Sequence, residues 1–395
     1  MQYLLTERAH LMCPNMCFGI LFSLGGAYER GRVVSALHKL SAAHPFLHAV
    51  IADADGRPYY MDKAGLETPF EEGVSAKKDY LEILKSGWDT RAECLLKVRA
   101  YPKKDGFDVL FAAHHLLCDG RGLLGLAVEF ADCYALDQAP ARADERLILA
   151  LSDLPRGSEL PLISRLVIGS ANRRWKKENH RVSYGEYLAF ERRYAQAHAP
   201  KMEIETVSDD AQAKNLAFCR QNGVTLNDLL IADMMRAENA RKVVIGADIR
   251  KEFSAYNPGS LGNYSTAFSV VSGEKSSDLA ALAKDVSLCV RQTLKSPKKL
   301  MLVLACYLHM TPELIDAAAI SALGGYESKA GRFVGGSMFG FQAGNGLSVT
   351  NLGKIESDTI LSAAFIPPAS PANRKTLGVL TVNGTMKLCG MTNVK

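Results

Sequence analysis

Two adjacent histidines, an aspartate and a glycine lie together in residues 114–120, whose sequence is HHLLCDG. An imidazole near neutral pH can take a proton from an attacking hydroxyl or amine and return it to a leaving group. Neighbouring side chains of a strand point to opposite faces, so only one of His114 and His115 can face a cleft. We therefore predict that one histidine is a general base and that the other supports it.

The same residues allow two other interpretations. His114, His115, Cys118 and Asp119 are of types that bind zinc, but adjacent histidines on a strand do not readily face one ion, and no second cluster of Cys and His lies at ligand spacing. A thiol beside Leu116 and Leu117 usually packs and has a raised pKa. We therefore expect no metal site, and we do not expect Cys118 to act as a nucleophile.

The elements around the motif predict that it lies on a loop between a strand and a helix. Residues 95–100 and 107–113 have strand character and are separated by Asp105-Gly106, a typical hairpin break. After the motif, apolar residues recur every three or four positions, which predicts an amphipathic helix beginning just past Gly120 and Gly122; they are Leu123, Leu124, Ala127, Val128, Ala131 and Tyr134. Gly120 would let the backbone turn sharply into this helix, where a side chain could obstruct a ligand.

Strands and helices are also predicted along the rest of the chain. A helix over 28–43 should end before His44-Pro45, where the proline disfavours helical geometry, and 46–52 should be a strand. Further helices are expected at 208–222, 225–240 and 276–294, with strands at 242–249, 264–271, 347–352 and 359–366. Thr225 and Asp228 form a near capping box, and Asn383-Gly384 predicts a final hairpin with strands 377–382 and 385–388.

The length of 395 residues favours two domains, because single cores stop growing beyond roughly 250 to 300 residues. Between about 136 and 200 several prolines surround the basic run 173–177, RRWKK. We therefore predict an N-terminal lobe over 1–150 that carries the motif, a connection over 151–200, and a C-terminal lobe over 201–395.

This connection contains two features with possible partners. The basic run could contact phosphates or an acidic protein, although most such runs are simply solvated. Leu162, Ile163, Leu166 and Val167 could form a surface helix for membrane contact. We expect instead a connecting helix that packs on its own protein.

Composition is typical of a globular protein, with 48% hydrophobic and 23% charged residues. The net charge of +5 is small for this length and argues against a dedicated nucleic-acid binder. Nine scattered cysteines without a CxxC pair favour reduced thiols. The longest apolar stretch, 300–308, is far shorter than the roughly 20 residues of a membrane span, and the N-terminus lacks signal-peptide features. We expect a cytoplasmic protein without a transmembrane segment.

The motif matches HHxxxDG, and the chain resembles the chloramphenicol acetyltransferase-like superfamily, which includes nonribosomal-peptide condensation domains and alcohol acetyltransferase-like proteins. Three further segments carry the resemblance, in the right order: residues 36–47, ALHKLSAAHPFL; Asp248-Ile249-Arg250 followed by Leu261-Gly262-Asn263-Tyr264; and Thr350-Asn351-Leu352-Gly353. The plant-family motif DFGWG is absent, and many relatives continue into another helix after the last strand. Both differences favour the alcohol acetyltransferase-like or stand-alone condensation branch.

The resemblance implies an α/β (α+β) fold of two lobes, each a mixed sheet with flanking helices, that meet along a central tunnel. His115 would be the catalytic residue at the centre, with His114 and Gly120 supporting the motif and Asp119 paired structurally with Arg250. Ser348, Thr350 and Asn351, on the strand taken as the one that crosses between the lobes, would be candidate oxyanion or tunnel residues.

The resemblance further implies an acyltransferase that moves an acyl group from acyl-CoA, or from a phosphopantetheine thioester on an acyl or peptidyl carrier protein, to the hydroxyl or amine of a small-molecule acceptor. No permanently bound cofactor, metal or nucleic acid is expected. The alternative is a catalytically inactive, condensation-domain-like binding or scaffold protein.

Overall fold

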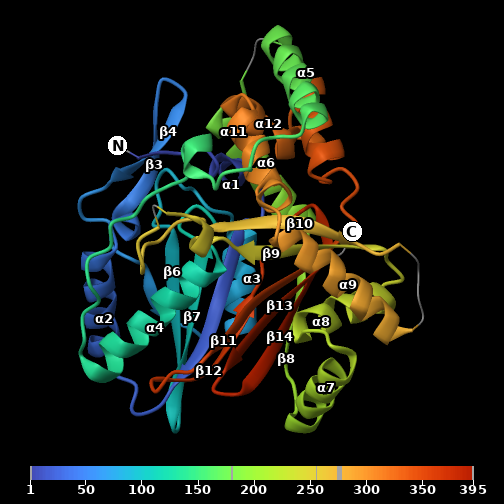
Figure 1. The fold of residues 1–395 in the computed structure, drawn as a ribbon. Coiled ribbons are helices and arrows are strands. Elements are labelled where there is room, and N and C mark those ends of the chain that lie inside the picture. The colour runs from blue at the N-terminus through green and yellow to red at the C-terminus, as the bar shows by residue number, and fades with distance from the viewer. Residues whose placement is uncertain (1, 179–180, 255, 274–277, 394–395) are drawn as a thin grey trace.

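The computed structural model describes residues 2–178, 181–254, 256–273 and 278–393. Two larger sheets lie side by side with helices around them, one formed mainly by the N-terminal part of the chain and the other by the C-terminal part (Figure 1). This is the mixed α/β architecture that the sequence predicts. Both histidines of the motif belong to the first of these sheets and its exit loop.

The first sheet has five strands in the order β12-β2-β7-β6-β5. Their bounds are β2 Cys17–Leu24, β5 Phe70–Glu72, β6 Leu96–Lys103, β7 Gly106–His114 and β12 Ile360–Ile366. All neighbours are antiparallel except β5 and β6. A three-stranded sheet beside it contains β1 Gln2–Tyr3, β3 Ala49–Ala54 and β4 Arg57–Asp62.

The strand β7 is buried on both faces, which explains its nearly continuous apolar sequence. Val109 and Phe111 belong to the large core cluster that includes α4, whereas Leu110 and Ala112 belong to a second cluster with α3. The helices of this part are α1 Arg8–Leu11, α2 Arg30–Ala43, the 3-10 helix η1 Pro45–His48, α3 Ala76–Ser86 and α4 Gly120–Leu136. The strand predicted at 46–52 is therefore half wrong: Pro45 begins a 3-10 turn, and the strand starts only at Ala49.

The second sheet has six strands in the order β10-β9-β11-β13-β14-β8. Their bounds are β8 Lys201–Thr206, β9 Lys242–Asp248, β10 Ser265–Val271, β11 Gly346–Ile355, β13 Asn373–Val382 and β14 Thr385–Thr392. The predicted hairpin is confirmed: Asn383 and Gly384 have φ values of 49° and 81°, as a tight hairpin turn requires.

The helices of the C-terminal part include those predicted around residues 208–240. Their bounds, with short 3-10 and π turns, are α7 Asp209–Asn222, α8 Leu226–Ala237, η3 Arg250–Glu252, α9 Leu279–Leu294, α10 Pro297–Leu300, α11 Leu302–His309, α12 Pro312–Ala322, α13 Lys329–Arg332 and η4 Phe333–Met338. The Thr225–Asp228 capping box is confirmed, with reciprocal hydrogen bonds of 2.8 and 3.2 Å. The first two residues predicted for the helix at 276–294 lie outside the described residues.

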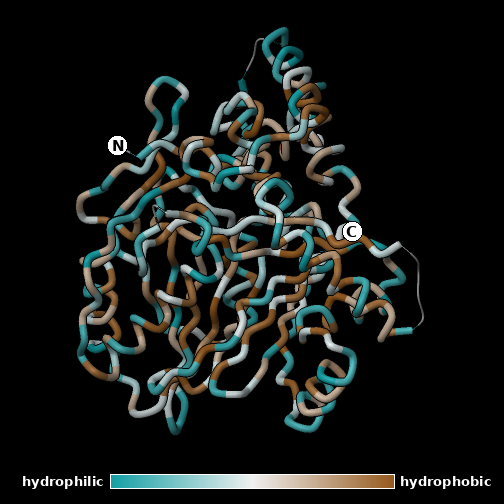
Figure 2. Tube along the Cα trace, in the orientation of Figure 1, coloured by the Kyte–Doolittle hydropathy of each residue, from teal (hydrophilic) through white to brown (hydrophobic). Residues whose placement is uncertain are grey.

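The two sheets touch through β12, which comes from the C-terminal part of the sequence but pairs with β2 of the first sheet. Phe365 of β12 lies against Gly378 of β13, where a Cβ atom would come within 2.5 Å of the Phe365 carbonyl oxygen. The strand that crosses between the sheets is therefore β12 and not β11, which carries Ser348 and Thr350 inside the second sheet. Apolar residues concentrate on these strands (Figure 2). The boundaries of the N-terminal lobe (1–150), the connection (151–200) and the C-terminal lobe (201–395) stay a prediction. The exception is β12, which falls in the last range but belongs to the first sheet.

The connection holds two long helices, α5 Leu162–Glu178 and α6 Tyr184–Ala197, after a short 3-10 turn η2 Leu151–Asp153. Ile168, Ala171 and Trp175 bury one side of α5. The helix therefore packs on its own protein as expected, but not through the apolar residues at its start, because Leu162, Ile163 and Leu166 are exposed.

No single helix among the described residues is long and apolar enough to cross a membrane. The helices α11 and α12 together meet the length and composition of a span, but they meet at an angle of 111°. Most of α12 is buried in the protein.

Candidate active site

The motif begins at the end of β7, where the chain leaves the sheet. His114 is the last residue paired with β2, opposite Cys17. The His115 N–H donates to the Met16 carbonyl at 2.8 Å, and the Leu117 N–H donates to the His114 carbonyl at 2.8 Å. These two bonds turn the chain directly after the histidines, so the motif forms the predicted strand-to-helix loop.

His114 points into its own lobe. Its ring lies edge-on to Trp88, with ring centroids 5.9 Å apart, on the face of the sheet that Leu110 and Ala112 share. The Leu116 N–H donates to His114 Nδ1 at 3.2 Å. Burial, with further contributions from His115 and Lys97, lowers the pKa of His114 to about 3. His114 is therefore a neutral, packed residue, which fits the supporting role expected for it.

His115 faces the other way and lines a cavity of about 250 Å³. The opposite orientations follow from strand alternation, as predicted from the sequence. The cavity wall comes from both parts of the chain and includes His10, Gly120, Gly246, Asn263, Thr266, Leu304, Tyr307, Ser348, Thr350 and Asn351. A group placed here can therefore contact His115 and both sheets at once.

Asn263 determines which nitrogen of His115 is free. The Asn263 Nδ2 donates to the His115 carbonyl at 2.8 Å, which directs Asn263 Oδ1 toward His115 Nδ1 at 2.9 Å. The amide oxygen only accepts hydrogen bonds, so Nδ1 must carry the proton of the neutral ring. Nε2 is then the unprotonated nitrogen, which is the form a general base needs.

The surroundings of His115 keep its ring neutral. Burial lowers the pKa of His115 below the ordinary 6.5, while the bond to Asn263 and the nearby Asp119 oppose this effect in part. The ring of Phe18 packs against it at 4.8 Å between centroids. At neutral pH His115 is thus ready to accept a proton.

A second histidine, His10 of α1, stacks on His115 with the ring centroids 4.4 Å apart and an interplanar angle of 8°. Burial, followed by the nearby imidazoles of His115 and His114, lowers the pKa of His10 well below its ordinary value. Its Nδ1 is buried without a hydrogen-bond partner among the described residues. His10 is not among the residues predicted from the sequence, because nothing in its local sequence indicates that it contacts His115.

Asp119 fastens the motif to the C-terminal part of the chain. Its Oδ1 caps α4 by accepting from Arg121 N at 3.0 Å and Gly122 N at 2.9 Å. The same oxygen accepts from Arg250 Nη2 at 2.8 Å, and Oδ2 accepts from Tyr264 N at 2.8 Å. The pairing of Asp119 with Arg250 that the family resemblance implies is therefore present. The partners in these four hydrogen bonds are three backbone N–H groups and one guanidinium, and Asp119 also lines the cavity.

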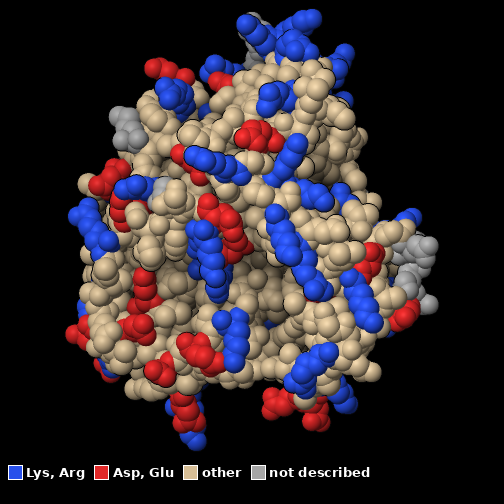
Figure 3. All heavy atoms as spheres, in the orientation of Figure 1, with Lys and Arg blue, Asp and Glu red and all other residues tan. Residues whose placement is uncertain are grey.

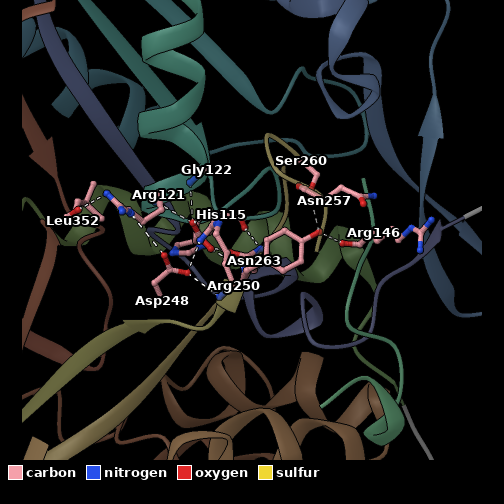
Figure 4. A network of polar contacts seen from close by, with 12 residues as sticks. His115, Arg121, Gly122, Arg146, Asp248, Arg250, Asn257, Ser260, Asn263 and Leu352 are labelled. Atoms are coloured by element: carbon pink, nitrogen blue, oxygen red, sulfur yellow. Dashed lines mark hydrogen bonds and ion pairs between the residues drawn. The ribbon is translucent and has the colours of Figure 1, made fainter. Parts of the chain in front are cut away.

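Arg250 is the centre of a polar network between the two parts of the chain (Figure 4). Its Nη1 also donates to Asp248 at 3.1 Å, and Arg121 of α4 donates to the Leu352 carbonyl at 2.7 Å. Burial alone would lower the pKa of Arg250, but Asp119 and Asp248 raise it above its ordinary value. The guanidinium is permanently charged and holds α4, β9 and the loop before β10 together.

The lack of a side chain at Gly120 allows close packing and does not serve a left-handed turn. Its φ lies outside the left-handed region, contrary to our expectation that it lets the backbone turn sharply. A Cβ atom here would lie 2.8 Å from Leu352 Cδ2 and 3.2 Å from Phe365 Cε2. Gly120 therefore allows the start of α4 to approach β11 and β12 closely at the cavity wall.

The three residues predicted as oxyanion donors or tunnel residues lie on one strand of the second sheet. Ser348, Thr350 and Asn351 all line the cavity from β11. Asn351 Oδ1 accepts from Gly353 N at 2.8 Å, at an irregularity in the strand. Their role as oxyanion donors stays a prediction.

Cys118 is buried, and burial raises its pKa well above the ordinary value, which favours packing over reactivity. Within the part of the chain that the structure describes, no group of three or more His, Cys, Asp or Glu residues is placed to hold a metal.

Comparison with solved structures decides the fold. The chain aligns over its whole length with a trichothecene 15-O-acetyltransferase from Fusarium sporotrichioides, at 12% identity, 91% coverage of that protein and a TM-score of 0.64. It also aligns over its whole length with the first condensation domain of the CDA synthetase, at 12% identity, 91% coverage and a TM-score of 0.59.

The chain has the chloramphenicol acetyltransferase-like fold. A third structure with this fold, the epimerization domain from the third module of tyrocidine synthetase B, covers 99% of the chain at 16% identity and a TM-score of 0.58, with 87% of that domain aligned. Searches of protein-family profiles and of curated proteins find no match. Proteins with this fold include an acetyltransferase, a condensation domain and an epimerization domain, so the fold alone does not determine the reaction.

Proposed function

We propose that the protein is an acyltransferase that moves an acyl group from a thioester to a hydroxyl or amine, with His115 as the general base. The observation that carries this proposal is the pair of hydrogen bonds between Asn263 and His115, which leaves Nε2 of a neutral His115 unprotonated in a cavity between the two sheets. The acetyltransferase and the condensation domain of the same fold support it.

In the proposed step, the acceptor hydroxyl or amine gives its proton to His115 Nε2 while its oxygen or nitrogen attacks the thioester carbonyl. The tetrahedral intermediate then breaks its C–S bond, and the imidazolium returns the proton to the departing thiolate. Ser348 or Thr350 would donate a hydrogen bond to the oxyanion from the facing wall. No acyl-enzyme forms, because His115 acts as a base and the buried Cys118 is not a nucleophile.

The size of the cavity bears on the substrates. At about 250 Å³ it lies just below the roughly 300 to 1,000 Å³ of whole-ligand pockets. The thioester end of acyl-CoA or of a carrier-bound phosphopantetheine would enter it, together with the reacting end of a small acceptor. All nine cysteines are free thiols, which fits the cytoplasmic location that we propose.

Free thiol release from acyl-CoA, measured with a panel of alcohols and amines, tests the proposal. Acceptor-dependent thiol release with formation of ester or amide is the expected result. A protein that binds acyl-CoA but never transfers the acyl group, with CoA and carrier donors alike, would instead be the binding or scaffold protein.

The pH dependence of turnover should reflect the lowered pKa of His115. Only the neutral ring can act as base, so activity should fall as the pH decreases through the pKa, with a midpoint below the ordinary 6.5, and should be flat near neutral pH. A pH profile of kcat/KM measures this midpoint in the free enzyme. A midpoint above 7 would contradict the neutral, buried state of the ring.

Asn263→Leu should lower kcat, because both hydrogen bonds between Asn263 and His115 are lost, one at the ring Nδ1 and one at the backbone carbonyl. Two hydrogen bonds at about 1 kcal/mol each correspond to a decrease in kcat of roughly tenfold to 100-fold. Asn263→Asp is the matched variant: its carboxylate keeps an acceptor beside Nδ1, and its charge should move the pH midpoint upward. If both variants kept the wild-type kcat and pH profile, Asn263 would not position the base.

A further inference from the structure

The outward side of α5 changes in character along the helix. Positions 162, 163, 166, 167, 170, 173, 174 and 177 share this side, as the helical period of 3.6 residues requires. In the first two turns they are apolar: Leu162, Ile163, Leu166 and Val167 are 71%, 77%, 64% and 36% exposed. A row of large apolar side chains this exposed is unusual on a protein surface and commonly marks an interaction site.

The last two turns of the same side are basic. Arg173, Arg174 and Lys177 point outward, and Lys176 is exposed beside them. None of the four forms an ion pair with a carboxylate in the part of the chain that the structure describes. The acidic residue of α5, Glu178, accepts from Ser328 Oγ at 2.6 Å and from Ala330 N at 2.9 Å, so its charge is used at the start of α13.

Basic side chains gather at the end of the molecule formed by α5 (Figure 3). The neighbouring α13 adds exposed Lys329 and Arg332 next to the helix, and exposed Phe333 follows them directly in the chain. Beside the apolar half, Arg156 and Arg165 line a cavity of about 310 Å³ in which Glu159 is the acidic residue. We call the outward side of α5 with Lys329, Arg332 and Phe333 the α5 surface.

We propose that the α5 surface docks on a membrane that contains anionic phospholipids. The apolar half inserts among the acyl chains near the head groups, and the basic half contacts the phosphates. The helix projects as a ridge at the edge of the fold (Figure 1), and a fluid interface accommodates protruding apolar side chains without a complementary groove.

Docking would place the membrane on the same side of the molecule as the helix α11, which lines the candidate active site. Asn172 of α5 donates to the His309 carbonyl of α11 at 2.9 Å and accepts from Thr311 N at 3.0 Å. The same helix α11 lines the cavity with Val303, Leu304 and Tyr307. The helix α11 thus connects α5, which carries the proposed membrane contact, to the wall of the cavity. The docking itself does not depend on the proposed reaction.

Sedimentation with vesicles tests the proposal. The protein should bind vesicles of phosphatidylcholine containing about one third phosphatidylglycerol, bind pure phosphatidylcholine far more weakly, and lose part of its binding at high salt. Arg173→Gln, Arg174→Gln and Lys177→Gln together should weaken binding by roughly 100-fold, at about fivefold per cation. Leu162→Ser, Ile163→Ser and Leu166→Ser together should weaken binding at low and at high salt.

Matched controls separate this surface from general effects of charge or exposure. Leu288→Ser with Leu294→Ser removes leucines of α9 that are 56% and 49% exposed, and Lys77→Gln, Lys78→Gln and Lys85→Gln remove exposed cations of α3. These controls should bind like the wild type, and thermal melting should show that all variants are folded. Equal binding to neutral vesicles, or equal effects of controls and α5 variants, would overturn the proposal. So would an absence of vesicle binding together with binding of an acidic carrier protein through the α5 residues.

Discussion

Replacing His115 by alanine is expected to lower acyl-thioester turnover by about 10²- to 10⁴-fold, the usual contribution of a positioned base. The ring lines the cavity, and Asn263 holds its Nδ1 so that Nε2 is unprotonated. The loss should appear in kcat and kcat/KM together, because proton transfer occurs in the transition state. Steady-state kinetics with the donor and acceptor found in the thiol-release assay measures it.

His114→Ala is the matched control for this prediction. It removes an imidazole from the adjacent position, but one that packs against Trp88 and does not line the cavity. We expect it to lower the melting temperature, with a smaller effect on turnover than His115→Ala. Wild-type turnover in a folded His115→Ala enzyme would contradict the role of general base and would favour the scaffold interpretation.

Replacing Asp119 by alanine is expected to destabilise the protein by about 3 to 5 kcal/mol, as breaking one side of a buried ion pair does. The side chain of Asp119 is 3% exposed and that of Arg250 12%. The change also removes the acceptor of the Arg121 and Gly122 N–H groups in the first turn of α4 and of the Tyr264 N–H. Activity should fall together with the melting temperature, because the loop that carries His115 loses its attachment.

A double-mutant cycle with Arg250→Met separates the ion pair from the helix cap. If the pair accounts for most of the loss, the double variant should be less destabilised than the sum of the single variants. Denaturant unfolding of the four proteins measures the coupling. An Asp119→Ala enzyme that is inactive but fully stable would point to a direct chemical role of the carboxylate.

Local sequence was sufficient for features that depend on neighbouring residues. The opposite orientations of His114 and His115 follow from strand alternation, the capping box from the spacing of Thr225 and Asp228, and the final hairpin from Asn383-Gly384. Each of these rests on backbone geometry within a few residues. The resemblance added the pairing of Asp119 with Arg250, which lie 131 positions apart.

Tertiary structure alone decided the features that join distant segments. Asn263 binds the His115 ring across 148 positions, and His10 stacks on that ring from the N-terminal helix α1. Pairing of β12 with the first sheet, and the exposure of Leu162 and Ile163, likewise depend on where whole elements pack. An apolar residue at helical spacing has the same local pattern whether its face meets the core or solvent, so only the packed fold distinguishes the two.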